Sequence, residues 1–75
     1  MRLKIKGEQP FQVIAHSCII SPSQESYTLQ FSADGDTYTD WNEPTPANEN
    51  TVIVNFPKFI FFRLKNNNSD VIVSY

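Results

Sequence analysis

The sequence predicts an all-β protein: a single small antiparallel β-sandwich or flattened barrel of about seven short strands. The chain of 75 residues is long enough for one domain, residues 1–75. Val, Ile, Thr, Tyr, Phe and Trp, which favour strands, make up 27 residues, whereas Ala and Leu together make up six. Apolar and polar residues alternate in several short segments that are separated by turn-forming residues, and no segment has helical periodicity.

The first two predicted strands differ in how strictly they alternate. In residues 1–6 the apolar residues Met1, Leu3 and Ile5 alternate with the basic residues Arg2, Lys4 and Lys6, which predicts a half-buried strand. Residues 7–10 predict a turn. Residues 11–20 predict a longer strand that is apolar on parts of both faces, so either a bulge shifts its register or both faces are covered.

A β-hairpin is expected in the middle of the chain. After a loop at 21–25, the segments 27–33 and 37–41 are rich in strand-forming residues and flank an Asp-Gly pair, a strong hairpin signal. A two-residue loop would place Trp41 on the face of Thr28. A three-residue loop with a G1-type bulge would instead pair Trp41 with Leu29, and the sequence leaves both registers open.

The remaining strands lie between polar loops. Residues 42–50, with two prolines, predict a surface loop. A strand is expected from Thr51 to Phe56, with Val52, Val54 and Phe56 on one face, and Pro57 ends it.

The last two strands are expected on either side of an asparagine turn at 66–68. Residues 70–75 predict the final strand. In the strand predicted at 59–65, Ile60, Phe62 and Leu64 form the inner face, and the outer face would carry Phe59, Phe61, Arg63 and Lys65. Phe59 and Phe61 therefore either lie in a central strand that is covered on both faces or face outward as interface residues.

The charges are segregated along the chain. Residues 7–57 contain seven acidic residues and no Lys or Arg, and all six basic residues lie outside this stretch. The basic residues either protect an edge strand or dock on an acidic partner, which could be a neighbouring copy's acidic loops. The candidate interface residues are Arg2, Lys4, Lys6, Phe59, Phe61 and Arg63.

Several classes of function are disfavoured. An acidic middle argues against binding duplex nucleic acid. The longest strongly apolar run, residues 59–62, is too short to cross a membrane, and no signal-peptide pattern begins the chain, so we expect synthesis in the cytoplasm. No catalytic residues and no cofactor are predicted, because no catalytic motif is present.

Two small clusters carry weaker alternatives. Cys18 and His16 would share a strand face and could form a thiol site, but a lone cysteine is most often a small buried apolar residue. Asp34, Asp36 and Asp40 are oxygen ligands of the kind that Ca²⁺ prefers, but the hairpin turn explains Asp34 without a metal, so no metal ligand is predicted.

Tyr38 and Trp41 are candidate glycan contacts. One aromatic face could stack on a sugar ring, and the polar residues nearby could bind its hydroxyl groups. The competing interpretation is that these two aromatic residues belong to the core of a small domain.

One stretch of the chain resembles a known family. Residues 27–41, Tyr-Thr-Leu-Gln-Phe-Ser-Ala-Asp-Gly-Asp-Thr-Tyr-Thr-Asp-Trp, resemble the hairpin of discoidin-like domains, in which a strand ends in Ser-x-Asp-Gly and the return strand carries an aromatic residue and then Trp. Residues 61–65, Phe-Phe-Arg-Leu-Lys, resemble the aromatic-Arg-aliphatic strand near the end of those domains. Because full discoidin-like domains are longer, their ligand loops are not carried over.

The whole chain resembles the small all-β accessory proteins of tailed-phage virions. The shared features are the short chain beginning at Met1, many Asn, Ser and Thr residues, the Asp-Gly hairpin, a Pro-Thr-Pro loop and a polar turn before the last strand. This resemblance implies an auxiliary capsid (head-decoration) protein on the capsid exterior of the virion. Its partners would be the major capsid protein, other virion proteins or copies of itself, and the alternative function is a small carbohydrate- or surface-binding module.

Overall fold

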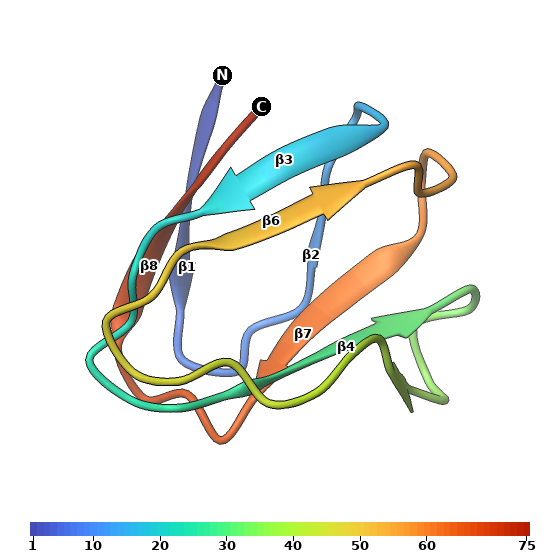
Figure 1. Cartoon of the computed structure of the whole chain (residues 1–75). Helices are drawn as coiled ribbons and strands as arrows, with labels where there is room; N and C mark the ends of the chain where they lie inside the picture. Colours follow the sequence, from blue (N-terminus) through green and yellow to red (C-terminus); the bar gives the residue numbers. More distant parts are fainter.

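The computed structural model describes residues 1–75 and is an all-β sandwich, which confirms the predicted fold class (Figure 1). It has eight strands rather than about seven, in two antiparallel four-stranded sheets. The strands are β1 (Arg2–Lys6), β2 (Phe11–Gln12), β3 (Ser17–Ile20), β4 (Thr28–Ser32), β5 (Thr39–Asp40), β6 (Thr51–Val54), β7 (Phe61–Lys65) and β8 (Asp70–Ser74). No helix is long and apolar enough to cross a membrane.

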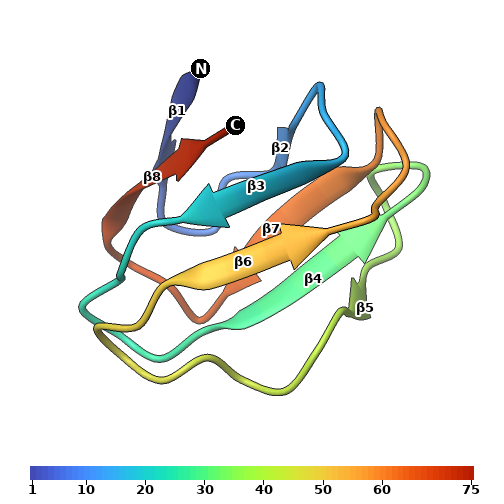
Figure 2. The same ribbon diagram turned by 45° about the horizontal axis from the view of Figure 1, so that its top comes forward.

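The two sheets face each other across one apolar core. The first sheet has the order β1-β8-β3-β6 and the second has the order β2-β7-β4-β5 (Figure 2). Alternation directs every second side chain of each strand inward, so both sheets contribute to the core. The buried apolar residues are Ile5, Phe11, Val13, Cys18, Ile20, Tyr27, Leu29, Ile53, Phe56, Phe62, Leu64, Val71 and Val73.

Residues 11–20 do not form the single strand that was expected. The chain pairs with β7 as β2, crosses between the sheets, and pairs with β6 and β8 as β3. The apolar residues on both faces are explained by this crossing, since β2 and β3 present different sides of the chain to the same core. Val13 is fully buried at the crossing, while the neighbouring Ile14 is 64% exposed.

The β4–β5 hairpin has the register of the three-residue alternative. Trp41 lies opposite Leu29 and donates its backbone N–H to Leu29 O at 2.8 Å. The connection between the two strands is longer than expected and spans residues 33–38. Its turn is held by Asp34, whose Oδ1 accepts the N–H groups of Asp36 at 2.9 Å and Thr37 at 3.1 Å.

The register of β6 differs from the expected one. Thr51 and Ile53 face the core, while Val52 and Val54 are exposed on the outer face of the first sheet. In a regular strand Phe56 would lie on the same exposed face as Val52, because an even number of residues separates them. Phe56 is buried instead, because the backbone turns at residue 55, where φ is 60°. The face proposed for residues 52, 54 and 56 is therefore wrong.

The inner face of β7 is confirmed. Phe62 and Leu64 are fully buried, and the half-buried Ile60 packs against the core. Phe59, however, lies in a turn before β7, with a left-handed φ of 67°, and not in the strand itself.

Candidate docking surface

β1 is an edge strand of the first sheet and carries three exposed basic side chains. Its register with β8 places Leu3 and Ile5 on the core side and Arg2, Lys4 and Lys6 on the outer face, as the alternation predicted. The ammonium group of Lys4 lies 3.6 Å from the Asp70 carboxylate, and both groups are more than half exposed. This is the single ion pair of the protein, so Arg2 and Lys6 present their charges to solvent.

The backbone hydrogen bonds show which groups of β1 are unpaired. Tyr75 N–H donates to Met1 O at 2.9 Å, and Gly7 N–H donates to Ser69 O at 3.2 Å. Both pairs continue the β1–β8 register, so the odd-numbered residues of β1 direct their N–H and C=O groups toward β8. Because neighbouring residues of an antiparallel strand point in opposite directions, the even-numbered residues direct theirs away from the sheet.

Part of this free edge is closed by the following turn. Gln9 N–H donates to Lys6 O at 3.0 Å, and Gln9 Oε1 accepts the N–H of Lys6. The backbone groups of Arg2 and Lys4 have no partner. An open stretch of strand edge therefore remains near the start of β1, beside the basic side chains.

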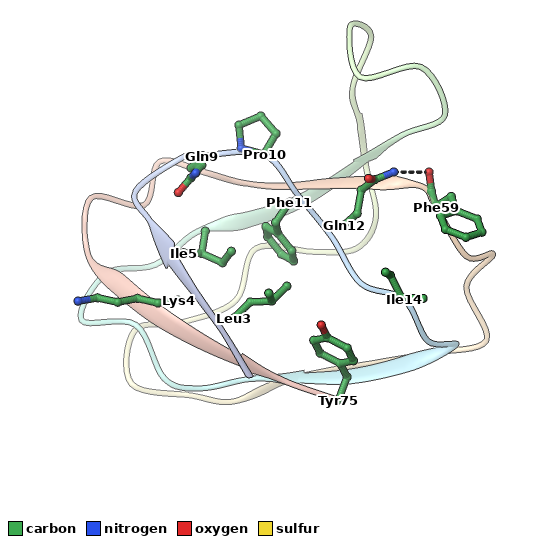
Figure 3. Close-up of a pocket in the computed structure, with 10 residues that line it drawn as sticks. All are labelled: Leu3, Lys4, Ile5, Gln9, Pro10, Phe11, Gln12, Ile14, Phe59 and Tyr75. Carbon is green, nitrogen blue, oxygen red and sulfur yellow. Dashed lines mark hydrogen bonds between the residues drawn. The ribbon is translucent and has the colours of Figure 1, made fainter. Parts of the chain in front are cut away.

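A groove with a volume of about 470 Å³ lies beside this open edge, between β1 and the segment that contains β2 (Figure 3). Leu3, Ile5 and Phe11 point into the space, and the hydroxyl end of Tyr75 points into it from one side. Lys4 points away from the groove. We call this space the β1 groove, and its lining residues are Leu3, Lys4, Ile5, Gln9, Pro10, Phe11, Gln12, Ile14, Phe59 and Tyr75.

One end of the β1 groove carries two exposed apolar side chains, Ile14 and Phe59, each 64% exposed. Gln12 Nε2 donates to Phe59 O at 2.8 Å, which fixes the turn that holds Phe59 in this place. The sequence pattern indicated Phe59 as an interface residue but not Ile14 or Tyr75. The adjacent apolar residues Val13 and Ile14, which cannot both face one side of a regular strand, were the available signal for a chain that leaves one sheet for another.

Phe61 and Arg63 lie in the other sheet, away from the basic side chains of β1. The guanidinium of Arg63 donates through Nε at 3.0 Å and Nη2 at 2.6 Å to Gln30 Oε1, and it stacks 4.1 Å from the centre of the Tyr38 ring. The half-buried Phe61 ring packs closely on the backbone of Gly35. The basic residues Arg63 and Lys65 therefore lie in a different sheet from those of β1.

Tyr38 and Trp41 contact opposite faces of the second sheet. Tyr38 stacks under Arg63 on the outer face. Trp41 packs on the core side, with its ring centre 5.1 Å from that of Phe31 and 5.9 Å from that of Phe62. The two rings do not form a shared platform for a sugar ring, and glycan contact by either residue stays a prediction.

The thiol and calcium candidates are explained by burial at Cys18 and by local hydrogen bonds at His16 and Asp34. Cys18 is buried in the core, and burial raises the pKa of its thiol to about 11. His16 lies outside β3, with Nδ1 at 2.8 Å from Phe56 O. The hydrogen bonds from the N–H groups of Asp36 and Thr37, with that from the Ser32 hydroxyl, lower the pKa of Asp34 to about 2.

A buried polar cluster that sequence analysis did not identify ties three loops together. The side chain of Asn67 is fully buried, and its Nδ2 donates to Gly7 O at 2.9 Å and Ser69 O at 2.8 Å. Its Oδ1 accepts the hydroxyl of Ser23 at 2.6 Å. The three consecutive asparagines at 66–68 indicated a turn but not which of them is buried.

No family model matches the sequence, and neither the curated proteins nor the solved structures include a significant match.

Proposed function

We propose that the chain is a non-catalytic structural protein of a tailed-phage virion, an auxiliary capsid protein that binds the capsid exterior through protein–protein contacts. The observation that carries the proposal is the combination at β1 of exposed basic side chains, an open strand edge and an apolar groove. Arg2, Lys4 and Lys6 supply electrostatic attraction, and Phe59 supplies an apolar anchor. Charged residues around an apolar centre are the usual composition of a protein interface.

The segregation of charge supports the same function. The connection from β4 to β6 carries five acidic residues and no basic one, whereas β1 carries three basic residues and no acidic one. A domain with unlike charges on different strands orients itself in the field of a charged protein surface. On a capsid the same contact is available at every equivalent position, so the number of bound copies depends on the affinity of one contact and on the concentration of the protein.

Composition analysis of virions tests the proposal directly. Virions of the phage whose genome encodes the chain should be purified and analysed by quantitative mass spectrometry. We expect many copies of the chain per particle, and absence from the particle would refute the proposal.

A binding experiment then tests the role of β1. The purified protein is incubated with heads that lack it, and the bound fraction is measured by co-sedimentation. The variant Arg2→Glu should weaken binding with an unchanged circular dichroism spectrum. The matched control Lys65→Glu changes the net charge equally at an exposed position of β7 and should bind as the unaltered protein does; equal loss in both variants would show that only net charge matters.

A further inference from the structure

We infer that β1 binds an extended segment of its partner by strand addition, and that this segment alternates acidic and apolar residues. The inference rests on the proposed docking function and names the chemistry of the partner. In strand addition, main-chain hydrogen bonds to a sheet edge supply affinity, and alternate side chains supply specificity. Three features of β1 each define one part of this partner: the open edge at Arg2 and Lys4, the β1 groove, and the row of basic side chains.

The open edge defines the conformation of the partner. Arg2 and Lys4 each present one N–H and one C=O that no other strand pairs, whereas Gln9 already occupies the edge at Lys6. An incoming strand therefore pairs with the first half of β1 and stops before the turn. All strand pairs in both sheets are antiparallel, and an antiparallel partner would extend the same pattern.

Strand geometry then determines where the side chains of the partner point. In an antiparallel pair, residues that exchange hydrogen bonds lie directly opposite each other and share a face of the sheet. The side chains of Arg2 and Lys4 are on the outer face, so the partner residues that bond to them also direct their side chains outward. Acidic side chains at these positions meet opposite charges.

The alternate residues of the partner point the other way, into the β1 groove. Its floor is apolar, from Leu3, Ile5 and Phe11, and Phe59 and Ile14 extend it at one end. Aliphatic side chains suit this space. An alternating acidic and apolar sequence therefore satisfies both faces at once.

The charge of β1 also selects against a second copy pairing through the same edge. Two β1 strands side by side would oppose Arg2 and Lys4 of one copy to Lys4 and Arg2 of the other, and like charges opposed across a strand pair are destabilising. The same row of charges that prevents this pairing attracts an acidic strand. Charge thus distinguishes the partner strand from the edge strand of a second copy.

A hexapeptide of alternating aspartate and valine, acetylated and amidated, is the probe. Titration into ¹⁵N,¹³C-labelled protein should shift the amide signals of Arg2 and Lys4 and the side-chain methyl signals of Leu3 and Ile14. Binding should weaken with added salt, because the charges are exposed. Replacement of the aspartates by lysine should abolish binding, and equal binding of the two peptides would overturn the acidic part of the inference.

Two N-methylated isomers of the peptide test strand addition itself. Methylation of the aspartate nitrogens removes the N–H groups that face β1, whereas methylation of the valine nitrogens removes N–H groups that face away. The first isomer should bind at least about tenfold more weakly than the second, because it loses backbone hydrogen bonds at the edge. Equal affinity of the two isomers would overturn the antiparallel pairing.

Variants of the protein provide the matching test. Lys4→Pro removes the free N–H of the edge without breaking a bond to β8, a position at which proline is tolerated. As the control, Val52→Pro places a proline at an exposed position of β6, which is the opposite edge strand of the same sheet. Only Lys4→Pro should lose peptide binding, and Lys4→Gln, which keeps the N–H, should retain a large part of it; unchanged binding by a folded Lys4→Pro variant would overturn the inference.

The outcomes separate this inference from the proposed function. If the chain is abundant in virions and Lys4→Pro still attaches to heads while the peptide does not bind, docking stands and strand addition is overturned. If the peptide binds at Arg2 and Lys4 but virions lack the chain, strand addition stands and the capsid function is overturned. Self-association that competes with the peptide, detected by light scattering, would assign the edge to a second copy and overturn the inference.

Discussion

Ser23 donates its hydroxyl to Asn67 Oδ1 at 2.6 Å, and both side chains are buried at the end of the sandwich where three loops meet. The residues are separated by 44 positions in the sequence. The same asparagine also binds the carbonyl groups of Gly7 and Ser69. The turn after β1 and the turn before β8, which lie at the same end of that strand pair, are thus linked to the loop before β4. These bonds stabilise the edge strand that carries the proposed docking surface.

Asn67→Ala should destabilise the protein strongly. The substitution leaves the Ser23 hydroxyl and two carbonyl groups without their buried partner, which costs about 2–4 kcal/mol at the usual penalty for unsatisfied groups. Urea unfolding followed by fluorescence measures the change. Asn68→Ala, at an exposed neighbour, is the control and should change the free energy of unfolding by less than about 0.5 kcal/mol; equal effects would contradict the buried cluster.

The register of β6 can be tested with two adjacent residues. Ile53→Ala removes a buried side chain and should cost about 2–4 kcal/mol of unfolding free energy. Val52→Ala removes an exposed one and should cost less than about 0.5 kcal/mol. The opposite order in chemical denaturation would restore the face first expected for residues 52, 54 and 56.

The turn at Asp34 should make stability depend on pH at the acidic end of the range. Hydrogen bonds hold the pKa of Asp34 at about 2, below the ordinary value of 3.8, so the folded state is favoured while the carboxylate is charged. This contribution is complete above the ordinary pKa and is lost as the pH falls through about 4 to about 2. As the pH decreases through this interval, the free energy of unfolding of Asp34→Asn should therefore fall less than that of the unaltered protein, which urea unfolding measures.

Asp36→Asn is the control for that measurement, because the Asp36 side chain accepts no hydrogen bond within the turn. Its stability should follow the same pH dependence as the unaltered protein. If Asp34→Asn also followed the unaltered curve, the pKa of Asp34 would not be lowered in the folded protein.

Cys18 should be inert in the folded protein. Its thiol is buried, and a pKa of about 11 leaves almost no reactive thiolate at neutral pH. A thiol reagent such as Ellman's reagent should react slowly under native conditions and rapidly in urea. Fast reaction of the folded protein would place the thiol at the surface and revive the thiol site with His16.

Local patterns in the sequence determined a large part of this fold. The alternation in residues 1–6 predicted which side of β1 is basic, because each residue of a strand faces opposite its neighbour. The same rule identified Phe62 and Leu64 as core residues of β7, and the Asp-Gly pair located the hairpin. Each of these predictions depends only on residues that are close in sequence.

The tertiary structure decided what depends on distant partners. Alternation cannot reveal that residues 11–20 divide between two sheets, because either sheet can cover an apolar side chain. A local backbone turn buries Phe56, and Arg63 binds Gln30 and Tyr38 instead of joining the basic row of β1. The open edge at Arg2 and Lys4 exists because the strand order places β1 last in its sheet, and strand order is set by long-range pairing that no short segment encodes.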